Sequence, residues 1–303
     1  MNIIKSIKNG TGVISVYHKL CRRKWTKYES DNLIGLYERL ICFEKFKKKY
    51  SYVIDNFEFK EKEQVKSNYI WFCWWQGLDN APDMVKANYN NLIRLFPNKK
   101  VIFLDKKNYS KYVSFPKWFV KKWEDGIVDN TKASNLLRLE LLNEYGGLWL
   151  DATVYISSNC LPRYIFDVPF FMYSEDGIGE IRTGATWLMY SYTNNPLLKL
   201  TEELYLEYWK NENELIEYFL ITFCLKMAKE HFDDIWKKMP KIPANNEILL
   251  AKCMFEEYDK EYFNDICQIT NIHKLSFKEN EEFYKKDNTY YQHILREMNN
   301  YNK

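Results

Sequence analysis

The sequence predicts an α/β fold, and two strand-like segments separated by a helix are the main evidence. Residues 69–75, YIWFCWW, form a continuous apolar and aromatic run with the length of a buried strand. Residues 100–105 form a second such run, which ends in an acid. A helix is predicted between them, because Pro82 suits a first helical position and apolar residues follow at helical spacing to Ile93. A strand, a helix and a strand in this order are typical of a parallel βαβ unit.

The remaining segments divide the chain into three expected regions. Residues 1–66 are expected to form two or three helices with one packed face, because Gly and Pro are nearly absent from 31–66 and apolar residues recur at helical spacing. Residues 67–277 form the main domain, and the polar tail 278–303 is expected to fray. Within the main domain we expect, in order, a short helix in 106–126, a helix from Thr131, a strand at 148–151, strands at 169–174 and 185–192, helical residues 196–231, a helix near 245–260 and an apolar segment at 272–277.

The composition indicates a soluble protein with a sizeable core. The chain has 303 residues, of which 46% are hydrophobic and 28% charged. Its seven cysteines include no CxxC pair, which favours reduced thiols in a cytoplasmic compartment over a disulfide framework or a zinc site. No secretory signal is evident, and no apolar run reaches the roughly 18 residues that a membrane span needs.

Positive charge is concentrated at the N-terminus. Residues 1–50 hold 12 Lys and Arg against 4 Asp and Glu, a balance of +8, whereas the whole chain carries +3. Clusters at 22–24 and 47–49 could meet the acidic head groups of a membrane surface. A solvated helix face is the alternative. Nucleic acid is not an expected partner, because no recognised binding motif accompanies the charge.

Polar side chains and a carboxylate meet in the segment 131–153. On the helix that begins near Thr131, the i, i+3, i+4 rule places four polar residues on one face; they are Thr131, Ser134, Asn135 and Arg138. Gly146 and Gly147 then allow a tight turn into a strand that ends at Asp151, with Trp149 on the same face. Ligands of open α/β sheets bind at such strand ends. A solvated stripe on the helix is the alternative.

Asp151, Thr153 and Trp74 are the remaining candidates for ligand binding. An acid at this place can bind Mg²⁺ or Mn²⁺ together with a diphosphate, because both ions prefer oxygen ligands. A cap of a turn or helix is the bland alternative for Asp151. Trp74, at the end of the first strand and before Gln76, could stack on a flat base. Trp71 and Trp75 are expected in the core.

Four segments together resemble a known family. IWFCWWQG, APDMV, TKASNLLRLELLNEYGGLWLDATV and HKLSFK resemble bacterial capsular polysaccharide synthesis glycosyltransferases. These are similar to glycosyltransferase family 32, which includes yeast mannosyltransferases, and more distantly to the glucosylating domains of large clostridial toxins. The resemblance is dense over 69–156 and thinner to residue 277. It implies a GT-A-like fold, with a Rossmann-type mixed sheet flanked by helices and an added helical N-terminal region.

The resemblance also implies roles for individual residues. Trp74 would stack on uracil, and the donor's sugar and phosphates would lie against Gln76, Ser134, Asn135 and Arg138. Asp151 would be the first acid of a DxD motif and, with Arg138, a catalytic residue. Two positions depart from the family pattern, since Asn135 and Thr153 stand where acids are usual. Thr153 and His273 could complete the ligands of a divalent cation around Asp151.

The predicted function is therefore a hexosyltransferase of capsule or exopolysaccharide assembly. It would transfer galactose or glucose, with retention of configuration, from a UDP-sugar to a lipid-linked saccharide. The basic N-terminal region would dock it to the inner face of the bacterial cell membrane. The alternatives are a mannosyltransferase that uses GDP-mannose and a non-catalytic protein that binds nucleotide sugars in a capsule assembly complex.

Overall fold

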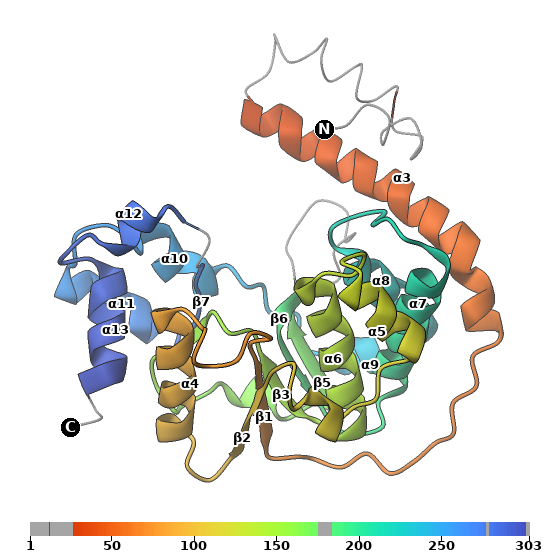
Figure 1. The fold of residues 1–303 in the computed structure, drawn as a ribbon, viewed down its shortest axis with the longest axis horizontal. Coiled ribbons are helices and arrows are strands. Elements are labelled where there is room, and N and C mark those ends of the chain that lie inside the picture. The colour runs from red at the N-terminus through yellow and green to blue at the C-terminus, as the bar shows by residue number, and fades with distance from the viewer. Residues whose placement is uncertain (1–11, 13–26, 175–183, 277–278, 301–303) are drawn as a thin grey trace.

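The computed structural model describes residues 12, 27–174, 184–276 and 279–300 (Figure 1). A mixed five-stranded sheet lies at the centre, in the order β2-β1-β3-β6-β5. Its strands are β1 (Tyr69–Cys73), β2 (Lys100–Leu104), β3 (Gly147–Leu150), β5 (Phe170–Tyr173) and β6 (Ala185–Ser191). Strands β2, β1 and β3 are parallel, while β6 and β5 run antiparallel to their neighbours. A second sheet pairs β4 (Val154–Ile156) with β7 (Ile272–Lys274). The predicted α/β fold with a mixed sheet is confirmed.

Helices cover both faces of the central sheet (Figure 1). The helix α4 (Asp83–Leu95) lies on one face, and α6 (Asn130–Glu144) lies on the other. The further helical elements are α5 (Lys117–Glu124), α7 (Pro196–Asn211), α8 (Leu220–His231) and α9 (Asp233–Lys238), with 3-10 turns at Tyr109–Lys111 and Arg163–Ile165. The helical stretch expected at 196–231 is thus two helices, α7 and α8. Trp71 and Trp75 are buried in the core, as predicted.

The Gly146–Gly147 turn has a steric cause. Both residues have positive φ, +65° and +99°, which side-chain-bearing residues rarely adopt. A Cβ on Gly147 would lie 2.5 Å from the carbonyl oxygen of Tyr69 in the neighbouring strand β1. Glycine at this position therefore allows β3 to begin directly after α6 and to pair with β1 from its first residues. The start of β3 is set in this way, and with it the position of Asp151 at the other end of the strand.

The N-terminal region contributes to the main core. Residues 27–55 form one long helix, α3 (Lys27–Asp55), and residues 56–68 contain no helix. Phe43, Phe46 and Tyr50 of α3 are buried in the same hydrophobic cluster as the sheet, against α7 and α8. The first part of α3 lies away from the sheet (Figure 1). The basic cluster at 22–24 lies outside the described residues. No described helix is both long and apolar enough to span a bilayer.

The expectation of a fraying C-terminal tail is wrong. A smaller second core joins α4 to the C-terminal helices (Figure 1). These elements are a 3-10 turn at Asn246–Ile248 followed by α10 (Leu249–Cys253), α11 (Lys260–Ile269), α12 (Glu281–Tyr284) and α13 (Tyr290–Asn300). The helix expected near 245–260 is thus present but shorter, over 246–253. Tyr290, Ile294 and Met298 recur every fourth residue and bury one face of α13, which gives the tail its reason to fold.

Candidate active site at the ends of the parallel strands

The predicted site lies at one edge of the central sheet. Strands β1, β2 and β3 are parallel, so their carboxyl ends lie at the same edge. Trp74 follows β1, Asp105 follows β2, and Asp151 follows β3. Strand β6 begins at this edge, where the carbonyl oxygen of Trp187 accepts a 2.9 Å hydrogen bond from the Asp151 backbone N–H. The sheet thus places Asp151 where α/β proteins bind ligands.

Asp151 is held by two side chains that the segment 131–153 supplies. The indole N–H of Trp149 donates to Oδ1 of Asp151 at 2.9 Å, so the predicted shared face of these two residues is confirmed. The guanidinium of Arg138 forms an ion pair with the same oxygen at 3.2 Å. Its central carbon lies 4.9 Å from the Trp149 ring centroid. The Asp151 side chain remains 29% exposed, so a ligand can reach it.

Arg138 acts from the buried side of the site. Only 4% of its surface is exposed. Its Nε donates to the backbone oxygen of Ser134 at 3.3 Å, and Nη1 donates to the backbone oxygen of Thr186. These two hydrogen bonds hold the guanidinium of Arg138 in place. Its ion pair with Asp151 positions the Asp151 carboxylate and offsets the negative charge of that carboxylate from the buried side. Direct contact of Arg138 with a donor stays a prediction.

Lys274 lies at this site and was not predicted from the sequence. It lies at the end of β7, whose pairing with β4 places Lys274 opposite Val154. Its ammonium donates to the hydroxyl of Thr153 and lies 4.0 Å from Oδ2 of Asp151. The side chain is 25% exposed. Lys274 belongs to the HKLSFK segment, in which the predicted ligand was its neighbour His273.

His273 is not assembled with Asp151 and Thr153. Neighbouring residues of a strand point to opposite faces, so His273 points away from the side on which Lys274 meets Asp151. Its ring stacks on Tyr155, and Nε2 lies 3.1 Å from the Ser157 hydroxyl. Burial lowers the pKa of His273 to about 3, because a charged imidazole would be desolvated there. The structure therefore does not bring together the three predicted metal ligands.

Asp151 has two cationic side chains as neighbours, Arg138 and Lys274. Two unit charges 4 Å apart near a protein surface interact by about 4 kcal/mol, so a doubly charged ion that close to Lys274 would be repelled by roughly 8 kcal/mol, and the Asp151 carboxylate at the same distance would attract it by about as much. Arg138 adds repulsion of the same sign, and the buried Thr153 supplies no negative charge. Among the described residues, no three His, Cys, Asp or Glu side chains gather as a metal site. A divalent cation beside Asp151 stays a prediction.

The other predicted donor-binding residues have different surroundings. The hydroxyl of Ser134 accepts from the indole N–H of Trp75 at 2.7 Å and donates to the Asn130 backbone oxygen. Asn135 is buried and lies at the hydroxyl of Tyr205 in α7. Trp74 is half-buried and Gln76 is exposed, both directly after β1. Base stacking on Trp74 stays a prediction.

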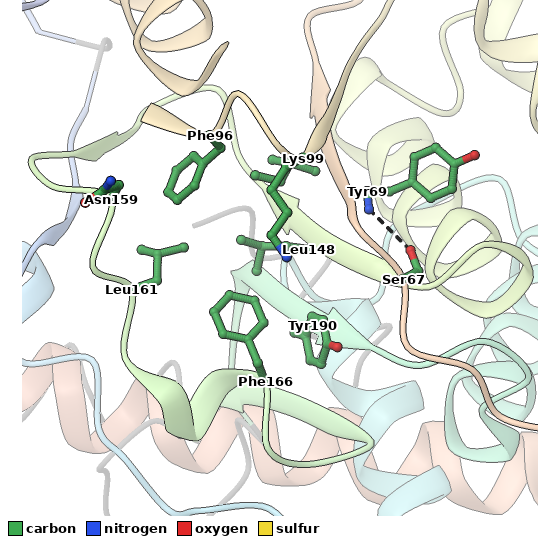
Figure 2. Close-up of a pocket in the computed structure, with 10 residues that line it drawn as sticks. Ser67, Tyr69, Phe96, Lys99, Leu148, Asn159, Leu161, Phe166 and Tyr190 are labelled. Carbon is green, nitrogen blue, oxygen red and sulfur yellow. Dashed lines mark hydrogen bonds between the residues drawn. The ribbon is translucent and has the colours of Figure 1, made fainter. Parts of the chain in front are cut away.

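A separate apolar cavity of about 150 Å³ lies at the opposite end of the sheet (Figure 2). It is lined at the start of β1 by Tyr69 and by Leu148 of β3, with Phe96 and Phe166 across the cavity. Parallel strands begin at the edge opposite to the one where they end. The cavity is therefore distinct from the surroundings of Asp151.

Comparison with known proteins shows to which family the chain belongs. Over 161 residues the chain is 30% identical to the O-glycosyltransferase braB of Annulohypoxylon truncatum, an alignment that covers 46% of this chain and 37% of that protein. The PaToxG glycosyltransferase structure covers 85% of the chain at 14% identity with a TM-score of 0.39, which is too distant to bear on function. The model of the family described as "Capsular polysaccharide synthesis protein" matches residues 22–294. Since this match extends over most of the sequence, the chain belongs to the capsular polysaccharide synthesis protein family.

Proposed function

We propose that this protein is a glycosyltransferase that transfers a hexose from a UDP-sugar to a lipid-linked saccharide during the synthesis of capsular or exopolysaccharide. The observation that carries the proposal is the Asp151 carboxylate, exposed at the carboxyl end of β3 and oriented by Arg138 and Trp149. Family membership and the partial match to a fungal O-glycosyltransferase support it. Kinship with glycosyltransferase family 32 and a bacterial origin belong to the same proposal.

The chemistry follows from the charges at the strand ends. The acceptor hydroxyl oxygen forms a bond to the anomeric carbon, and the bond from that carbon to the diphosphate breaks with its electron pair going to the phosphate oxygen. The acceptor proton passes to the departing phosphate, which places both on one face of the sugar and retains its configuration. Positive groups at this edge stabilise the charge that develops on the diphosphate, which is a large contribution in such reactions.

The test of this site is the turnover of UDP-galactose and UDP-glucose by the wild type and by Asp151→Ala. We expect roughly 100-fold slower hydrolysis or transfer in the variant. Asp167→Ala, on the exposed Arg163–Asp167 pair, is the matched control and should leave turnover unchanged. Equal turnover by the wild type and Asp151→Ala would remove the assigned role, and an inverted anomer in NMR of the product would exclude the front-face route.

A second candidate function is non-catalytic binding of nucleotide sugars. Asn135 and Thr153, which are neutral and buried, favour it because each stands where the family resemblance leads one to expect an acid. UDP binding without turnover of any donor, in the presence of lipid-linked acceptors, would support this function. Competition between UDP and GDP separates a UDP-sugar enzyme from one that uses GDP-mannose.

Docking to an anionic membrane surface is part of the proposal, and the structure sharpens its test. Deleting residues 1–66 would remove Phe43 and Phe46 from the core, so loss of binding could reflect unfolding. Lys47 and Lys49 are engaged with Glu230 and Glu212. Deleting residues 1–26 instead removes the cluster at 22–24 and spares α3. Unchanged binding of this truncated protein to anionic vesicles would contradict docking through that cluster.

A further inference from the structure

We propose that the apolar cavity at the start of β1 and β3 binds a small apolar acid, a molecule with a ring or short chain of about six carbons and one carboxylate. The apolar part fills the cavity, and the carboxylate binds the ammonium of Lys99. This site lies at the opposite end of the strands from Asp151. It is additional to the donor site and does not depend on the proposed function.

The size and the walls of the cavity determine the apolar part of the ligand. One wall is a row of residues in register on three neighbouring strands, Ile70, Leu148 and Tyr190. Phe96 and Phe166 stand across from this row (Figure 2). The volume of the cavity is about 150 Å³. In another protein, an engineered cavity of about 150 Å³ with similar apolar walls binds benzene, so a group of that size fits here.

Lys99 determines the acidic part of the ligand. Of the ten described residues that line the cavity it is the one with a charge, and it lies on the turn between α4 and β2 (Figure 2). Its ammonium donates to the side-chain oxygen of Asn68 at 2.9 Å and lies 5.6 Å from the ring centroid of Phe166. A lysine ammonium has three donors, so two of them are open to a ligand. Beside apolar walls, its attraction for an anion is stronger than in water.

The described surroundings of Lys99 contain no acidic partner for it. The segments that enter the cavity from outside β3 and β6 lack acids, and they are residues 67–70, 96–99 and 159–166. The next acid along the chain, Asp167, forms an exposed ion pair with Arg163 at 3.7 Å. The helix α6, which ends at Glu144, covers the other face of the sheet. In the described part of the chain, Lys99 therefore bonds only a neutral amide and faces an aromatic ring.

Tyr190 supplies a second polar group in the wall of the cavity. Its side chain is buried, with 2% exposed, yet its hydroxyl makes no hydrogen bond to any described residue. A hydroxyl on so buried a residue usually has a partner. An oxygen of a bound acid can accept this hydrogen bond. An apolar wall with a few polar groups of this kind is typical of small-molecule sites.

The first experiment is a fluorine NMR titration with 4-fluorobenzoate and with its neutral counterpart 4-fluorobenzyl alcohol. We expect wild type to bind 4-fluorobenzoate with a Kd of about 1 mM or lower. Lys99→Met keeps an apolar chain but removes the ammonium, so it should bind 4-fluorobenzoate at least about 10-fold more weakly, as expected for the loss of a charged hydrogen bond. Its binding of the alcohol should stay near that of wild type, which separates a lost contact from a damaged cavity.

Lys100→Met is the matched control, because Lys100 is the next residue, is exposed and does not line the cavity. It removes the same charge from almost the same place on the surface. Its affinity for 4-fluorobenzoate should stay within about threefold of wild type, since exposed charges are screened by salt.

Leu161→Trp tests where the probes bind. Leu161 lines the cavity from a loop and is partly exposed, so a larger side chain should fill the cavity without changing the sheet. Binding of both probes should be lost, while thermal unfolding checks that the variant folds. UDP should displace neither probe from wild type, because the candidate donor site lies at the other end of the strands.

Several results would overturn the proposal. They are failure of wild type to bind either probe at millimolar concentrations, displacement of the probes by UDP, equal affinity of wild type and Lys99→Met for 4-fluorobenzoate, and an equal loss in Lys99→Met and Lys100→Met. Hexanoate and dodecanoate separate a small acid from a lipid chain. Similar affinities for the two support a small acid, whereas binding of dodecanoate more than about 10-fold tighter would assign the cavity to a lipid and refute the small acid.

Discussion

The buried ion pair between Arg138 and Asp151 gives the sharpest stability prediction. Arg138→Met keeps much of the side-chain volume, but it removes the 3.2 Å ion pair and the bonds to two backbone oxygens. Breaking a buried ion pair costs about 3–5 kcal/mol. Asp151 is 29% exposed and regains water when the pair is broken, so the lower end of that range, about 3 kcal/mol of unfolding free energy, is expected.

The assay is urea unfolding followed by tryptophan fluorescence in a double-mutant cycle with Asp151→Asn. Removing both charges leaves neither one without its partner, so the double variant should be about 1–2 kcal/mol more stable than the sum of the single changes implies. Arg163→Met is the control, because its partner Asp167 is 3.7 Å away and both are exposed; a change below about 0.5 kcal/mol is expected. Additive single changes, or a loss in Arg138→Met no larger than in the control, would refute the positioning role.

Three further predictions concern stability. Gly147→Ala should destabilise the fold by more than about 2 kcal/mol in urea unfolding, because its Cβ meets the Tyr69 carbonyl at positive φ; a smaller loss contradicts the steric account. Burial lowers the pKa of His273 to about 3, so below pH 6.5 the unfolded chain binds a proton at this histidine that the folded protein does not bind. About 2 kcal/mol of unfolding free energy is therefore lost between pH 7 and 5. His273→Phe should lose that component, while His231→Gln should keep it. Burial raises the pKa of Glu140 to about 8, so the free energy of unfolding falls as pH rises from 4.5 to 8. Glu140→Gln should therefore be more stable than wild type at pH 8 but not at pH 4. Equal stability of the two proteins at pH 8 would contradict this prediction.

The local pattern of the sequence determined most of the central fold. The aromatic run 69–75, the helix after Pro82 and the second run 100–105 became β1, α4 and β2. The Gly-Gly turn and the strand ending at Asp151 also formed as expected. These predictions succeeded because periodicity and turn chemistry act over a few residues and do not depend on the rest of the chain.

The C-terminal helices and the N-terminal helix α3 were less predictable from the local sequence pattern. The C-terminal residues contain few apolar side chains, so composition alone indicated a fraying tail. The face formed by Tyr290, Ile294 and Met298 becomes meaningful only beside α4, whose Met84 and Ala87 lie in the same cluster. Likewise, the spacing of apolar residues in 33–43 did not indicate that Leu40 stays exposed while Phe43 is buried.

The sequence by itself determined that a carboxylate stands at the end of a buried strand, with an arginine and a tryptophan close by along the chain. Only the tertiary structure decided which residue distant in the sequence brings its charge beside the Asp151 carboxylate. Lys274 lies more than one hundred residues from Asp151 and reaches it because β7 pairs with β4. The same pairing turns His273 to the opposite face. A strand's register and facing depend on a partner distant in the sequence, and no local pattern carries that information.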